Sequence, residues 1–93
     1  MNSGFPASVA IPADVMARQV GDETVILHLG SGNYYGLDPV GARAWQLLGE
    51  GRTPAEVCEQ LLGEYDVARV QLEADLQTLL QDLLANGLLT AGA

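Results

Sequence analysis

The side chains that could carry out chemistry are few, and they lie far apart in the sequence. His28 is the one histidine and Cys58 the one cysteine among the 93 residues. A zinc site gathers about four Cys, His or carboxylate ligands at short spacings, and a thiol nucleophile needs a neighbouring base. Neither residue has such a partner nearby. We therefore predict a half-buried structural histidine in a strand and an inert thiol buried on an apolar helix face.

The acidic residues and the glycines do not form a catalytic motif either. Twelve acidic residues are spread along the chain, and no spacing singles out a pair for general acid–base catalysis. The segment Gly30-Ser31-Gly32 precedes a tyrosine-containing strand, whereas a phosphate-binding loop precedes a helix. We therefore expect a protein that is not an enzyme and that uses no metal or cofactor.

The composition indicates which partners the surface disfavours. The net charge is −8, and the chain contains four arginines but no lysine. Such a surface repels the phosphates of nucleic acids and anionic membranes, although it suits a basic partner and also serves solubility. No apolar run approaches the roughly 20 residues of a membrane span, no secretory signal is recognisable, and a lone cysteine suits a reducing compartment. We expect a cytoplasmic protein that binds neither nucleic acid nor membrane.

The first half of the chain is expected to place its tyrosines on a hairpin. Residues 17–38 predict strand, turn, strand, turn, strand. Gly21-Asp22 supplies the first turn and Gly30–Asn33 the second, because glycine and asparagine accept the positive φ of tight hairpins. Successive side chains point to opposite faces of a strand, so Tyr35 and Leu37 of the third strand face one side and Tyr34 the other.

Three helices are expected to follow the strands. Asp38-Pro39 is typical of a helix start, since Asp caps free N–H groups and Pro loses no hydrogen bond there. This first helix ends at Gly49–Gly51, and Thr53–Glu56 forms a capping box for the second. The third helix is predicted from near Asp66 to Asn86-Gly87, where glycine provides a left-handed stop.

The order of the elements predicts an α+β fold. Three strands followed by three helices match a winged helix-turn-helix-like domain with a three-stranded antiparallel sheet. We place a flexible N-terminal arm at residues 1–16, the domain at 17–90 and a short tail at 91–93. Winged helices commonly read DNA with their last helix. In this chain that helix contains one arginine, Arg69, and several acidic residues, so it is poorly suited to bind DNA. A winged-helix transcription regulator or a small adaptor protein is the alternative function.

The third helix carries one apolar stripe. With about 100° between successive residues, the stripe contains Leu72, Leu76, Leu79, Leu80, Leu83 and Leu84. Asp75 and Asp82 lie along one margin of it, beside Leu79. Most of these leucines are expected in the core, whereas the residues at the margin are expected to border a groove between the helix and the sheet edge.

Five short motifs, in order, resemble the PqqD-like proteins, which are the peptide-recognition elements of pathways that modify ribosomally made peptides. They are Gly-x-Tyr-Tyr-x-Leu at 32–37, Asp-Pro-Val-Gly-Ala at 38–42, Trp45, Thr-Pro-Ala-Glu-Val at 53–57 and Gly-Leu-Leu at 87–89. The resemblance covers roughly residues 17–89. Asp38 stands where the family more often has asparagine, but both residues cap helices.

The resemblance implies a non-catalytic protein that captures the leader of a precursor peptide and presents it to a modifying enzyme. The leader is implied to add to the third strand and to place side chains in a groove against the third helix. In this mode main-chain hydrogen bonds give affinity and pockets give specificity. The implied peptide-binding residues are Asn33, Tyr34, Tyr35, Gly36, Leu37, Asp38, Asp75, Leu76, Leu79, Asp82 and Leu83. The strand has no lysine or proline to block its edge, although strand tyrosines are also common in hairpin cores.

Two pathways fit the implied partners. In lasso-peptide clusters the partner beside the precursor leader is a leader peptidase, and in pyrroloquinoline quinone synthesis it is a radical S-adenosylmethionine enzyme. The general resemblance favours the lasso type. We expect a monomer or a weak homodimer.

Overall fold

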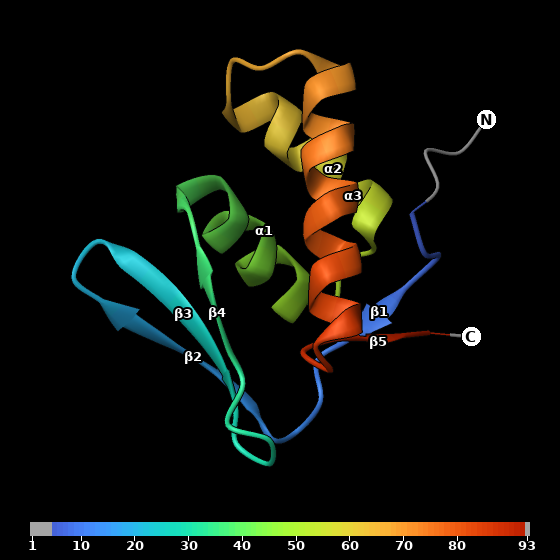
Figure 1. The fold of residues 1–93 in the computed structure, drawn as a ribbon. Coiled ribbons are helices and arrows are strands. Elements are labelled where there is room, and N and C mark those ends of the chain that lie inside the picture. The colour runs from blue at the N-terminus through green and yellow to red at the C-terminus, as the bar shows by residue number, and fades with distance from the viewer. Residues whose placement is uncertain (1–4, 93) are drawn as a thin grey trace.

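The computed structural model describes residues 5–92 and places three helices on one side of a three-stranded sheet (Figure 1). The elements in chain order are β1 (Val9–Ala10), β2 (Val15–Val20), β3 (Glu23–His28), β4 (Tyr34–Leu37), α1 (Pro39–Gly49), α2 (Pro54–Glu64), α3 (Arg69–Ala85) and β5 (Thr90–Ala91). Strands β2, β3 and β4 pair in that order, each antiparallel to the next. The predicted α+β order is confirmed.

Both hairpin turns of the sheet lie where the sequence predicts them. Gly21 and Gly32 have φ values of 62° and 77°, in a region that residues with a Cβ rarely adopt. The His28 N–H donates to the Asn33 carbonyl at 2.8 Å, which closes the hairpin between β3 and β4.

The sheet presents one face to the helices and the other to solvent. Tyr35 pairs with Ile26, which is fully buried, and Leu37 on the same face is buried too. Tyr34 points to the opposite face and is 75% exposed. The predicted alternation of the two tyrosines is confirmed.

The starts of α1 and α2 have the predicted caps. The Asp38 Oδ1 atom accepts a hydrogen bond from the Gly41 N–H at 2.7 Å. In the capping box of α2, the Thr53 hydroxyl accepts from the Glu56 N–H, and the Glu56 carboxylate accepts from the Thr53 N–H. These bonds satisfy backbone donors that the first turn of a helix leaves free.

Helix α3 begins later than the sequence predicts. Its first residue is Arg69, after Ala68, which has no side chain to cap the helix. Tyr65 is extended, and the Val67 N–H donates back to the Tyr65 carbonyl at 3.1 Å. Asp66 therefore lies in the connection from α2 instead of at the helix start, so the predicted boundary is wrong by about one turn.

The end of α3 agrees with the prediction. Gly87 has a φ of 72°, and its N–H donates to the Leu84 carbonyl while the Leu88 N–H donates to the Leu83 carbonyl. This pair of bonds is the Schellman motif, which ends a helix at a left-handed glycine.

One hydrophobic core joins the inner face of the sheet to all three helices. Its buried members include Ile26, Leu37, Ala44, Trp45, Leu47, Leu48, Val57, Leu61, Leu72, Leu76, Leu80, Leu83, Leu88 and Leu89. Leu79 and Leu84 of α3 are only partly buried. Cys58 also lies in this core, and burial raises the pKa of its thiol, which agrees with the predicted inert cysteine.

His28 has the predicted half-buried, structural environment. Its Nδ1 atom accepts from the Ser31 N–H at 3.1 Å, and its Nε2 atom lies 3.4 Å from a carboxylate oxygen of Asp14. Within residues 5–92 there is no cluster of His, Cys, Asp or Glu that could hold a metal ion. No helix in the same range is both long enough and apolar enough to span a membrane.

The two ends of the domain pair with one another. Strand β1 is antiparallel to β5, with Val9 opposite Ala91 and Ala10 opposite Thr90, so parts of the expected arm and tail are held in a small second sheet. Strand β2 also begins at Val15, two residues before the predicted domain boundary. Residues 1–4 of the expected arm and residue 93 of the expected tail lie outside the described residues.

Candidate functional site

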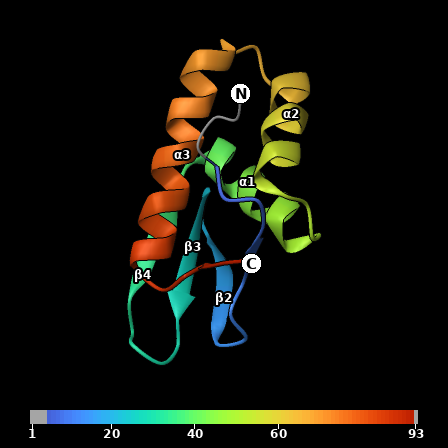
Figure 2. The same ribbon diagram turned by 90° about the vertical axis from the view of Figure 1, so that its right-hand side faces the viewer.

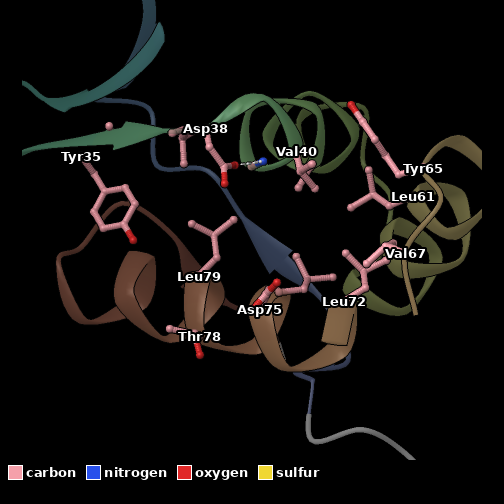
Figure 3. Close-up of a pocket in the computed structure, with 15 residues that line it drawn as sticks. Tyr35, Asp38, Val40, Leu61, Tyr65, Val67, Leu72, Asp75, Thr78 and Leu79 are labelled. Carbon is pink, nitrogen blue, oxygen red and sulfur yellow. Dashed lines mark hydrogen bonds between the residues drawn. The ribbon is translucent and has the colours of Figure 1, made fainter. Parts of the chain in front are cut away.

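A hollow of about 560 Å³ opens between strand β4 and the helices (Figure 3). Figure 2 shows β4 and α3 together on one side of the molecule and α2 on the other. The residues that line the hollow are Tyr35, Gly36, Leu37, Asp38, Val40, Gly41, Ala44, Leu61, Tyr65, Val67, Leu72, Asp75, Leu76, Thr78 and Leu79. We call this hollow the groove.

One wall of the groove is the edge strand β4. Strand β4 pairs with β3 on one side and is the last strand of the sheet. In an antiparallel pair, successive residues point their N–H and C=O groups alternately toward and away from the neighbouring strand. The Asn33 carbonyl bonds to β3, so Tyr35 and Leu37 also face β3, whereas Tyr34 and Gly36 direct their backbone groups to the open edge.

Gly36 leaves this edge sterically open. A Cβ atom added there would meet nothing within 4 Å. The open edge of β4 therefore has one exposed tyrosine and one residue without a side chain. Such an edge is available for pairing with another extended chain.

The opposite wall is the side of α3 that faces β4. Leu76 and Leu79 of this helix line the groove. Leu79 points from α3 toward β4 (Figure 3), and Asp75 and Thr78 are exposed at the solvent rim of the same wall. Leu76 is only 3% exposed, whereas Leu79 is partly buried. Leu76 thus belongs to the floor, and Leu79 is shared between the core and the open groove.

The groove extends past the end of β4, over the start of α1. Val40 and Ala44 of α1 and Leu61 of α2 form the apolar floor there. Tyr65 and Val67, from the connection between α2 and α3, close the far end (Figure 3). An apolar pocket beside a free strand edge can hold the side chains of a paired peptide, whereas no histidine, cysteine or serine lines it to act as a nucleophile.

Three carboxylates lie in or near the groove in different bonding states. Asp38 caps α1, and Asp75 accepts a hydrogen bond from the Gln71 side chain at 2.9 Å. Asp82 accepts a hydrogen bond from the Tyr35 hydroxyl at 3.0 Å. Asp38 and Asp75 are exposed at the rim, so they are the two carboxylates that could face a basic group on a ligand.

The sequence also matches a protein-family model. Residues 23–89 match the model of coenzyme PQQ synthesis protein D (PqqD), a span that includes β3, β4, all three helices and every residue of the groove. The chain belongs to the PqqD family. The predicted resemblance is confirmed.

Two solved structures resemble this PqqD-family chain over nearly its whole length. One is TbiB1 in complex with the TbiA(beta) leader peptide, with 42% identity, a TM-score of 0.79 and coverage of 89% of this chain and 96% of TbiB1. The other is lasso peptide synthetase B1 complexed with the leader peptide, with 31% identity, a TM-score of 0.78 and coverage of 89% and 98%. No curated protein matches the chain significantly.

The groove of this PqqD-family protein contains seven of the residues that sequence reasoning selected. These are Tyr35, Gly36, Leu37, Asp38, Asp75, Leu76 and Leu79. Asn33 and Tyr34 lie beside the open strand edge but do not line the groove. Asp82 lies outside it, bound to Tyr35, and Leu83 is a core residue with 1% exposure.

Sequence reasoning missed the half of the groove that follows β4. The residues not selected are Val40, Gly41, Ala44, Leu61, Tyr65, Val67, Leu72 and Thr78. One signal could have pointed to some of them, because Asp38-Pro39 turns the chain directly from the edge strand into α1. The first turn of α1 must therefore continue the wall that β4 begins.

Proposed function

We propose that this protein binds the leader of a ribosomally made precursor peptide as an additional strand on β4 and presents it to a modifying enzyme. The observation that carries the proposal is the open backbone edge at Tyr34 and Gly36 beside an apolar groove. In β-strand addition the edge supplies main-chain hydrogen bonds, and pockets for alternate side chains supply specificity. Both parts are present here on one side of the domain.

The two similar solved structures support this proposal. Each is a complex with a leader peptide, and each is matched over almost its whole length at 31% or 42% identity. One of them is a lasso peptide synthetase B1, which favours a lasso-type pathway with a leader peptidase as the modifying enzyme. Pyrroloquinoline quinone synthesis, with a radical S-adenosylmethionine enzyme, is the second candidate.

The proposed role is non-catalytic. The groove offers hydroxyls of Tyr35, Tyr65 and Thr78 and carboxylates at its rim. The Tyr35 hydroxyl donates to Asp82, a bond that links strand to helix, and within residues 5–92 neither the Tyr65 nor the Thr78 side chain is hydrogen-bonded to a base. Binding of DNA by α3 is disfavoured, because its one arginine, Arg69, is engaged by Glu59 and Glu73.

A binding titration tests the proposed function directly. The probe is a labelled synthetic leader peptide from the precursor that sequencing of the neighbouring genes identifies, called the cognate leader below. We expect saturable 1:1 binding, at least about tenfold tighter than binding of a scrambled peptide, and no retention of duplex DNA at low salt. DNA retention without leader binding would instead support a winged-helix regulator.

The outer face of the sheet offers a second surface, for the modifying enzyme. The strand register places Met16, Leu27 and Tyr34 in one row and Arg18, Val25 and Gly36 in the next. Met16, Val20 and Tyr34 on this face are 44%, 58% and 75% exposed. A bound leader would add its outward-facing side chains to the same face, so an enzyme docked there would contact the protein and its guest together.

Arg18 gives this face a specific charge. Arg43, Arg52 and Arg69 each form an ion pair with a glutamate, whereas Arg18 pairs with no acidic residue in the described range 5–92. It lies in an apolar row of a protein with a net charge of −8. We infer that the docked enzyme presents an apolar patch with a carboxylate opposite Arg18.

An arginine reversal tests this docking surface. Arg18→Glu should lower capture of the leader peptidase encoded with this chain by about tenfold or more, while the affinity for the cognate leader stays within about twofold. Arg52→Glu is the matched control, since Arg52 is an exposed arginine away from the sheet. Equal capture by the two variants would place the enzyme on another surface, and lost leader binding in Arg18→Glu would show that the two surfaces are not separate.

A further inference from the structure

The two walls of the groove are joined at one end by a hydrogen bond. The Tyr35 hydroxyl of β4 donates to the Asp82 Oδ2 atom of α3 at 3.0 Å, between residues 47 apart in the sequence. Among residues 5–92, no other side-chain hydrogen bond or ion pair connects the three-stranded sheet to α3. Figure 3 shows the Tyr35 ring reaching from the strand toward the helix.

The bond has the properties of a persistent contact. It is partly buried, and it joins a neutral donor to an ionised acceptor, a combination stronger than a bond between neutral groups. Burial, the hydrogen bond to Asp82 and the charges of Asp82 and Asp38 all raise the pKa of the Tyr35 phenol above its ordinary value. The hydroxyl therefore remains a protonated donor at neutral pH.

We propose that Tyr35 and Asp82 form a clasp that holds β4 and α3 at the separation a guest peptide requires. This inference rests on the proposed leader binding and assigns Tyr35 and Asp82 as positioning residues. At the base of the groove, Leu37 of β4 and Leu76 of α3 belong to the same core. The clasp adds a polar link across the opening, so it fixes the spacing of the two walls there before the guest arrives. Preorganisation of this kind improves affinity because less order must be imposed on binding.

The clasp also limits where guest side chains can enter. The Tyr35 ring occupies the space between β4 and α3 at the Asn33 end of the strand. The groove-facing side chains of the guest must therefore lie between Tyr35 and Tyr65, over Val40 and Leu79. Asp82 is already bound to Tyr35, so in this proposal its role is to accept that hydrogen bond, whereas direct contact with a basic leader residue is left to the exposed carboxylates of the rim.

Three substitutions separate the clasp from a charge effect. Tyr35→Phe keeps the ring and removes the donor, and Asp82→Ala removes the acceptor. Each should weaken binding of the cognate leader by about 5- to 20-fold. Asp82→Asn removes the charge but keeps an oxygen acceptor, so its affinity should stay within about threefold of the original protein. The double variant Tyr35→Phe/Asp82→Ala should bind no more weakly than either single variant, because both remove the same bond.

The thermal stability of each variant is also measured without peptide, so that a loss of binding can be told from a loss of folding. Leu84→Ala serves as a control that loses stability on α3 outside the groove, and it should keep its affinity. Unchanged affinity in Tyr35→Phe would overturn the clasp. Equal losses in Asp82→Asn and Asp82→Ala would also overturn it, since they would assign Asp82 a charge role instead. If the original protein itself fails to bind the cognate leader, the proposed function fails first, and that result is distinguishable from a failed clasp.

Discussion

Gly36→Pro is expected to weaken leader binding strongly and leave the fold intact. The Gly36 N–H points to the open edge of β4, so proline removes a donor for the guest strand without breaking a bond to β3. Proline is tolerated at such edge positions for this reason. With the donor lost and the ring beside the guest backbone, affinity should fall by at least about 30-fold, equivalent to roughly 2 kcal/mol. The free energy of unfolding should change by less than about 1 kcal/mol.

Gly36→Ala is the matched control for this substitution. The added Cβ meets nothing within 4 Å, and the N–H group is kept, so affinity should stay within about threefold. Titration of the cognate leader and thermal melting provide the two measurements. Wild-type affinity in folded Gly36→Pro would mean that the guest does not pair with β4.

Leu79→Ala should weaken leader binding by about 1–3 kcal/mol, the usual range for an interface anchor, or about 5- to 150-fold in Kd. Leu79 lines the groove and is partly buried, so its loss removes contacts both to the guest and to the core. We therefore also expect a loss of folding stability of up to about 2–3 kcal/mol.

Leu84→Ala separates these two effects. Leu84 lies on the same helix and is also partly buried against the core, but it does not line the groove. Its truncation should cost a similar stability and leave leader binding unchanged. If both variants lose binding in proportion to their stability, Leu79 has no contact with the guest.

The parts of the fold that depend on local chemistry could be predicted from the sequence. Gly21 and Gly32 mark the turns, Asp38 and Thr53 cap helices, and Gly87 ends α3, because each acts on backbone atoms within a few residues. The start of α3 was predicted wrongly, since Asp66 has the right chemistry for a cap but lies in an extended connection. The pairing of β1 with β5 joins residues about 80 positions apart, and no local signal specifies it.

In the candidate site, too, the features set by local periodicity could be predicted and those set by packing could not. The alternation of side chains along β4 correctly predicted that Tyr35 and Leu37 lie on one face of the sheet and Tyr34 on the other. This prediction needs only the two-residue period of a strand. Helical periodicity identified the apolar stripe of α3 but could not tell which leucines face the groove. Leu79 lines it, whereas Leu83, one turn further, is enclosed by the core. The floor from α1 and α2 depends on how the helices pack, which the sequence does not reveal residue by residue.

The hydrogen bond that Asp82 accepts from Tyr35 could not be predicted from the sequence either. Its spacing from Asp75 predicts two similar carboxylates on one margin of α3. Only the approach of β4 distinguishes them, since Tyr35 bonds to Asp82 and leaves Asp75 exposed at the rim. Asp75 therefore stays a candidate for contact with a basic leader residue, and Asp82 becomes part of the groove itself.

Residue-resolved amide hydrogen exchange, with and without saturating cognate leader, tests strand addition most directly. The Tyr35 and Leu37 amides already bond to β3, so they should exchange slowly in both states and act as internal controls. The Tyr34 and Gly36 amides face the open edge, and Gly36 above all should slow by at least about tenfold when the leader binds. Leader binding that leaves these two amides unprotected, or that protects only the opposite edge strand β2 (Val15–Val20), would contradict the account.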